Sequence, residues 1–112
     1  MNSAKKETGL TEATEKAIIN VVSSQPKAQE LLLYGSRAKS TFRHSSDIDL
    51  VLKGEELTIS DKFAIENELD DLMLPYKIDL ALYQHIKNED LLRHIDRVGL
   101  LLFDRKRAET TS

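Results

Sequence analysis

The sequence predicts an α/β domain in which helices flank a small mixed sheet of about four strands. Three observations predict this class. Predicted helices and strands alternate along the chain, and two of the strands are separated by a segment long enough for a parallel crossover. The chain has 112 residues, 40% of them hydrophobic, which is enough for one domain only. We expect the domain to span residues 10–103 and residues 104–112 to form a polar, frayed tail.

The first half of the chain is expected to supply a helix and two strands. Apolar residues at helical spacing predict a helix over residues 11–22, and Pro26 follows its end. A short apolar run predicts a buried strand over residues 30–34, which Gly35 ends. Residues 47–53 alternate, with one parity wholly aliphatic, as in a half-buried strand. The polar and basic stretch between these strands can hold a short helix followed by a loop.

The second half is expected to supply two helices and two strands. Ser60 is a plausible N-cap for a helix over residues 61–73. Alternation returns in residues 77–83 and predicts another strand. Asn88 can cap a last helix, which precedes a final strand over residues 100–103.

Composition excludes several classes of protein. Lys and Arg total 16 against 19 Asp and Glu, a formal charge of −3, so stable binding to a nucleic-acid duplex is not expected. The absence of cysteine excludes disulfides, thiolate zinc sites and a cysteine nucleophile. We find no secretory signal and no apolar run long enough to cross a membrane, so we expect a soluble, cytoplasmic protein.

Three aspartates lie on the polar parity of two predicted strands. Asp47 and Asp49 are two residues apart, so both side chains leave one face, roughly 6–7 Å apart. Asp79 lies on the next strand, and parallel pairing would bring the three carboxylates together. Clustered carboxylates raise one another's pKa unless a cation lies between them, and hard oxygen ligands suit Mg²⁺. Two such ions can hold the attacking and leaving oxygens of a phosphoryl displacement.

A second motif, which follows the first strand, suits a phosphate group. Gly35 permits close approach to the backbone, and the Ser36 hydroxyl and nearby amides are donors for phosphate oxygens. Ten residues separate Ser36 from Asp47, so a chain that turns back would place donors and metal ligands in one cleft. Arg37 and Arg43 lie in this stretch and can offset phosphate charge.

Residues 35–50, GSRAKSTFRHSSDIDL, resemble the signature of the DNA polymerase beta nucleotidyltransferase superfamily. Within it, the chain resembles the minimal nucleotidyltransferases (MNT) that act as antitoxins of HEPN toxins. The resemblance implies a palm-like nucleotidyltransferase fold in which Asp47 and Asp49 bind two Mg²⁺ ions. It implies Asp79 as a ligand of the nucleophile-side ion and a candidate proton acceptor.

The same resemblance implies that Gly35 and Ser36 hold the triphosphate of ATP. Many relatives have glycine where this chain has Ser40, which puts the path of the loop in question. The implied reaction moves AMP from ATP to a hydroxyl, with a tyrosine of a cognate all-helical HEPN ribonuclease toxin as acceptor. Two alternatives stay open. The chain could transfer a nucleotide to a small molecule held by a separate helical subunit, or it could neutralise its partner by contact alone.

Other polar residues are assigned no part in the site. The histidines share no metal-ligand spacing and are expected at the surface or in packing: His44, His85 and His94. The tyrosines are expected to pack at the sheet edges: Tyr34, Tyr76 and Tyr83.

Overall fold

The computed structural model describes residues 8–39 and 46–110, and it has the predicted α/β architecture. Its elements, in chain order, are α1 (Glu12–Ser23), β1 (Glu30–Tyr34), β2 (Ile48–Lys53), α2 (Ile59–Asp70), β3 (Ile78–Leu82), the 3₁₀ turn η1 (Tyr83–His85), α3 (Glu89–Val98), β4 (Leu100–Asp104) and α4 (Arg105–Thr110). Within the described ranges, no helix is both long and apolar enough to span a membrane.

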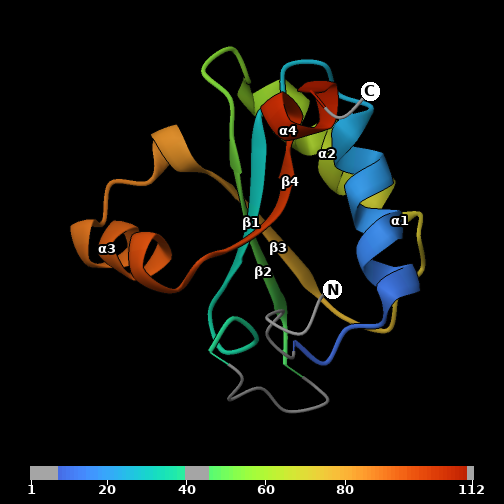
Figure 1. Cartoon of the computed structure of the whole chain (residues 1–112), viewed down its shortest axis with the longest axis horizontal. Coiled ribbons are helices and arrows are strands. Elements are labelled where there is room, and N and C mark those ends of the chain that lie inside the picture. Colours follow the sequence, from blue (N-terminus) through green and yellow to red (C-terminus); the bar gives the residue numbers. More distant parts are fainter. Residues whose placement is uncertain (1–7, 40–45, 111–112) are drawn as a thin grey trace.

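The four strands form one mixed sheet in the order β3-β2-β1-β4 (Figure 1). The pair β2 and β3 is parallel, which confirms the pairing predicted from the length of the connection through α2. The central strand β1 runs antiparallel to both β2 and β4.

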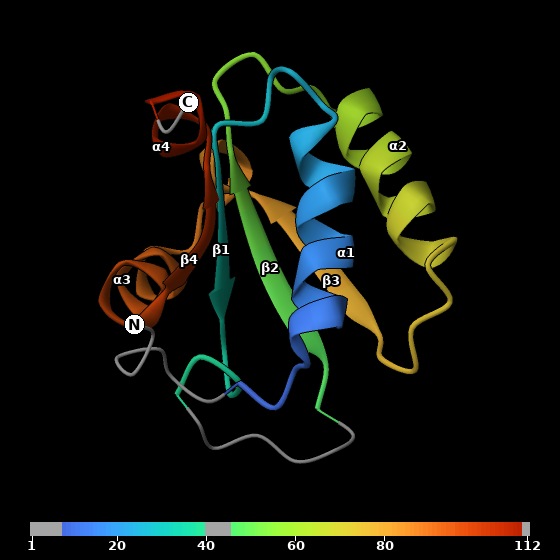
Figure 2. The ribbon, with the colours of Figure 1, turned by 45° about the vertical axis from the view of Figure 1, so that its right-hand side comes forward.

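Helices α1 and α2 lie on one side of the sheet, and α3 lies on the other (Figure 2). The main core fills the space between the sheet and the first two helices. Its fully buried side chains come from one parity of β1 and β2 and from the inner faces of the helices: Ile18, Val22, Leu31, Leu33, Leu50, Leu52, Ile65 and Leu69. Since the other parity of each strand must point away from this core, it faces the side on which α3 lies.

Helix α2 begins two residues earlier than predicted, so the assignment of Ser60 as its N-cap is wrong. The cap is Thr58, whose hydroxyl accepts the N–H of Asp61 at 3.2 Å, while the Asp61 carboxylate accepts the N–H of Thr58 at 2.9 Å. This reciprocal pair satisfies two donors at once, which a serine followed three residues later by Phe63 cannot do. Asn88 caps α3 as predicted, accepting from the N–H groups of Asp90 and Leu91.

Residues 105–110 form a helix, where a frayed tail was expected. This helix is α4, and Arg105 anchors it. The Arg105 guanidinium donates to three backbone carbonyls around the end of α1, those of Ser23, Gln25 and Ala28, at 2.8–3.0 Å. These bonds hold the tail against the α1–β1 connection.

Candidate active site

One row of side chains crosses three strands on the sheet face opposite α1 and α2. Tyr34 of β1 pairs with Asp49 of β2, and Asp49 pairs in parallel register with Asp79 of β3. Directly opposed residues on one face of a sheet have Cβ atoms about 4.5–5.5 Å apart. The structure therefore brings the carboxylates of β2 and β3 together, as the strand pattern predicted.

Asp47 comes just before β2 and has the same parity as Asp49, and its side chain is exposed. Burial raises the pKa of the Asp49 carboxyl above its usual range, and the negative charges of Asp79 and then Asp47 raise it further. Asp49 is thus close enough to Asp79 and Asp47 for their charges to repel its own.

A divalent cation would relieve this repulsion, and carboxylate oxygens are the donors that Mg²⁺ prefers. In residues 8–39 and 46–110, no three acidic or histidine side chains are already gathered tightly enough to hold an ion. The carboxylate donor set fits Mg²⁺ in chemistry.

Gly35 follows β1 and lies directly against Asp49. Its φ of +79° is in the left-handed region, and a Cβ added at this position would overlap Oδ2 of Asp49. Only glycine meets both conditions without strain. We expected a ligand to approach this glycine closely, and in the structure the carboxylate of Asp49 does so. Residues 35–39 form turns, with the N–H of Lys39 donating to the carbonyl of Gly35 at 3.3 Å.

His94, to which the sequence assigned no role, contacts this turn from α3. Its Nε2 accepts the backbone N–H of Gly35 at 3.2 Å. Its ring also meets Tyr34 edge to face, with centroids 6.2 Å apart and planes at 77°. No sequence signal could have joined these residues, because 59 positions separate Gly35 from His94.

Tyr34 lies close enough to the carboxylates for their charges to act on its phenol. Burial raises the pKa of its phenol, and the charges of Asp49 and then Asp79 add to the rise. The phenol therefore stays protonated and offers an O–H donor beside the acidic row.

Arg37 is buried and bonds to backbone carbonyls, and its contact with phosphate stays a prediction. Its side chain is 1% exposed, and its guanidinium donates to the carbonyl of Thr8 at 2.8 Å and to that of Ser46 at 3.0 and 3.3 Å. It also lies over the Tyr76 ring, 4.8 Å from the centroid. Arg37 therefore joins the segment before α1 to the residue that precedes Asp47. The predictions for Arg43 and Ser40 lie outside the described residues.

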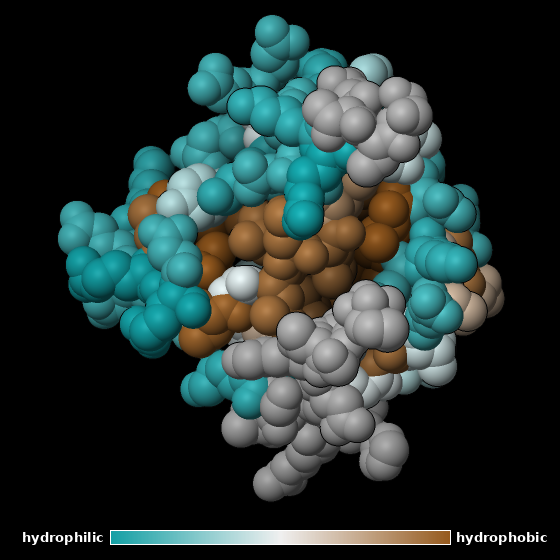
Figure 3. Space-filling model, in the orientation of Figure 1, coloured by the Kyte–Doolittle hydropathy of each residue, from teal (hydrophilic) through white to brown (hydrophobic). Residues whose placement is uncertain are grey.

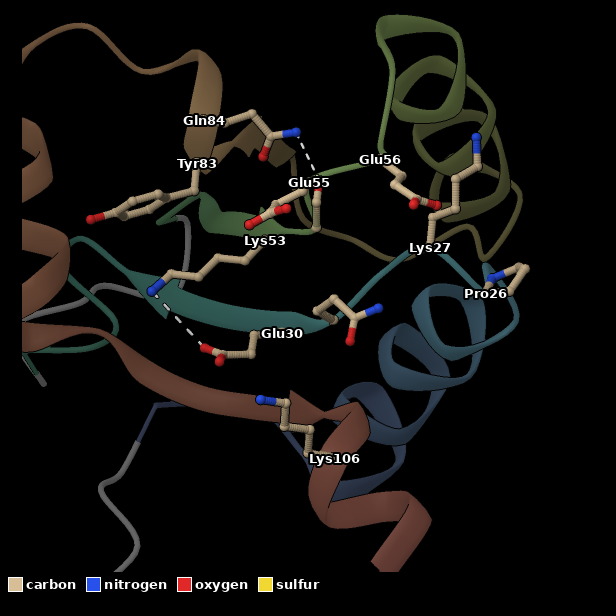
Figure 4. A pocket seen from close by; sticks show the side chains of 11 residues that line it. Pro26, Lys27, Glu30, Lys53, Glu55, Glu56, Tyr83, Gln84 and Lys106 are labelled. Carbon is tan, nitrogen blue, oxygen red and sulfur yellow. Dashed lines mark hydrogen bonds and ion pairs between the residues drawn. The ribbon is translucent and has the colours of Figure 1, made fainter.

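A pocket of about 720 Å³ lies at the other end of the sheet, where β1 begins and β2 and β3 end (Figure 4). Lys53 crosses it, with its ammonium 4.4 Å from the centroid of the Tyr83 ring and 4.0 Å from the Glu30 carboxylate. Glu30 and Tyr34 are four residues apart on β1, or about 13 Å. The pocket is thus separate from the carboxylate row.

Comparison with known proteins gives a family match and a set of solved structures with a similar fold. A family model described as "Polymerase beta, Nucleotidyltransferase" matches residues 16–108. No curated protein is detectably similar in sequence to the chain.

Solved structures that share the fold include the following two. The first is a toxin–antitoxin with AMP-PNP, at 22% identity and a TM-score of 0.69. The alignment covers 84% of this chain and 76% of the solved chain. The second is a tri-AMPylated Shewanella oneidensis HEPN toxin in complex with an MNT antitoxin, at 19% identity and a TM-score of 0.66, with 89% of this chain and 77% of its own aligned.

Proposed function

The chain belongs to the polymerase beta nucleotidyltransferase family, and we propose that it is an antitoxin that transfers AMP from ATP to a tyrosine of a cognate HEPN toxin. The observation that carries the proposal is the placement of Asp49 beside Asp79, with Asp47 near enough to raise the pKa of Asp49. The resemblance in fold to HEPN toxin complexes with MNT antitoxins, one of them tri-AMPylated, supports the choice of acceptor.

In the proposed reaction, the acceptor oxygen attacks the α-phosphate of ATP, and the bond to the bridging oxygen breaks, so that pyrophosphate leaves. Asp47 and Asp49 would hold two Mg²⁺ ions and Asp79 one of them. When bound, the ions supply positive charge to the phosphate oxygens. Asp79 is exposed on the edge strand β3, where it can accept the proton of the acceptor hydroxyl. Ser36, in the turn against Asp49, is proposed to donate to the triphosphate.

The surface beside the carboxylates supports a protein acceptor. A row of apolar residues crosses all four strands on the same face, next to the carboxylate row: Leu101, Leu32 and Ala81, which are at least partly exposed, and Val51, which is buried. Leu101 is 43% exposed, and Figure 3 shows apolar surface gathered over the strands at the centre of this view. Apolar surface framed by polar residues is typical of protein interfaces. An acceptor protein that reaches Asp79 from this face would cover this apolar surface.

The experiment is incubation of the chain with labelled ATP, Mg²⁺ and the helical protein encoded beside it, followed by mass spectrometry of that protein. Wild type should add AMP to a tyrosine, and Asp49→Asn should not. Asp70→Asn, which removes an exposed carboxylate at the end of α2, is the matched control and should behave as wild type.

The same experiment separates the alternatives. Label transferred to a small molecule and never to the protein would favour a separate substrate-binding subunit. Full neutralisation of the partner by Asp49→Asn, with no adduct in either case, would favour inhibition by contact and overturn the proposal.

A further inference from the structure

His94 connects α3 to the turn that lies against Asp49, and nothing in the proposed reaction accounts for it. We propose that His94 is a positioning residue, which holds the Gly35–Ser36 turn in the orientation that binds the triphosphate. The inference rests on the proposed function, because it assigns to this turn the binding of ATP. It does not require His94 to touch the nucleotide.

Gly35 is held from two sides. The Asp49 carboxylate lies against its Cα, where a side chain would otherwise project, and the His94 imidazole accepts its N–H at 3.2 Å. Glycine is the residue whose backbone rotates most freely, so a turn built on it keeps its orientation only if its peptide groups are bound. The hydrogen bond from the Gly35 N–H fixes the peptide plane that precedes Gly35. The Gly35 carbonyl accepts the N–H of Lys39 at 3.3 Å, so the peptide groups on both sides of Gly35 are bound, and together they fix the direction in which the chain continues to Ser36.

The imidazole is itself held in place. Nε2 accepts, so a neutral ring carries its proton on Nδ1. The Tyr34 ring packs against it in an edge-to-face contact with a centroid separation of 6.2 Å. The next residue of α3, Ile95, is 1% exposed and anchors the helix to the sheet. Asp96 adds a second attachment by accepting the Tyr83 hydroxyl at 3.0 Å. The His94 side chain thus connects α3 to the turn.

Two substitutions separate the hydrogen bond from the ring contact. His94→Phe keeps a ring beside Tyr34 and removes the acceptor, whereas His94→Gln keeps an acceptor near the position of Nε2 and removes the ring. Arg93→Gln is the control on the same helix, because it removes exposed ion pairs with Glu89 and Asp90 inside α3 and leaves the bonds of His94 and Asp96 untouched.

The measurements are the KM for ATP and kcat of AMP transfer, the Kd for ATP without the toxin, and amide exchange of Gly35 without nucleotide. Loss of one neutral hydrogen bond should raise the KM and the Kd about fivefold to tenfold in His94→Phe, with kcat within about twofold. Gly35 exchange should accelerate in this variant. His94→Gln should recover the KM to within about threefold of wild type, and Arg93→Gln should leave it unchanged.

The inference is overturned if His94→Phe leaves the KM and Gly35 exchange as in wild type. It is equally overturned if Phe and Gln variants both lower kcat and the melting temperature with no change in the KM, since that is the result of a purely structural role. Failure of the proposed function would look different: wild type would transfer no AMP, while the Gly35 exchange data would still show whether His94 holds the turn.

Discussion

Gly35→Ala tests whether the site depends on the contact between the turn and Asp49. An alanine at φ +79° adopts a conformation that costs roughly 1–2 kcal/mol for a residue with a side chain. Its Cβ would also overlap Oδ2 of Asp49, so the carboxylate would have to move by about 1 Å to reach ordinary van der Waals contact. Displacement of a catalytic group by this amount reduces rates on the order of 100-fold. The expected loss of transfer thus exceeds what the loss of stability explains.

Gly9→Ala is the matched control, because Gly9 also has a positive φ, 77°, and lies exposed, outside the carboxylate row. Each kcal/mol lost should lower the melting temperature of either variant by roughly 4–8 °C. AMP transfer, measured well below both melting temperatures, should fall on the order of 100-fold in Gly35→Ala and stay close to wild type in Gly9→Ala. Equal activity of the two variants would refute the reasoning, since the overlap with Asp49 would then have no consequence.

Three further predictions, with five substitutions, test other parts of the structure. Because the pKa of Asp49 is raised in the folded chain, its ionisation opposes folding, so wild-type stability should fall as pH rises from about 4 through the raised pKa. In urea unfolding, the loss of stability with rising pH should be smaller for Asp49→Asn than for wild type. Mg²⁺ should raise the melting temperature of wild type only, and a Mg²⁺ response in the variant would contradict the assignment of ligands. Arg37→Met should lower the free energy of unfolding by about 2–4 kcal/mol, because it removes the guanidinium that donates to the carbonyls of Thr8 and Ser46. Arg37→Lys should not restore this stability, since an ammonium group lacks the planar set of N–H donors that reaches both carbonyls. Full rescue by lysine would disprove the need for that planar set. Thr58→Ala should cost about 1 kcal/mol and Ser60→Ala less than about 0.5 kcal/mol in the same assay, and the reverse order would restore Ser60 as the cap.

The elements that follow from short-range patterns could be predicted from the sequence. Alternation in residues 47–53 and 77–83 reflects the two-residue period of a strand, which the covalent geometry of the backbone sets. The length of the chain between them favoured parallel pairing, and the structure confirms it with Asp49 opposite Asp79. The cap of α2 was misplaced because Thr58 and Ser60 are both good caps taken singly, and only the reciprocal bond to Asp61 distinguishes them.

The partners of the polar side chains were decided by the tertiary structure alone. Arg37 is predicted from its charge and its place after Ser36 to contact phosphate, but only the folded chain shows that its guanidinium donates to the carbonyl of Thr8, 29 residues away. His94 has no pattern that marks it, and it reaches Gly35 because α3 packs on the face of the sheet that carries the carboxylates. Local periodicity is a property of neighbouring residues, whereas a hydrogen bond between distant segments depends on how the whole chain packs, and no short stretch of sequence contains that information.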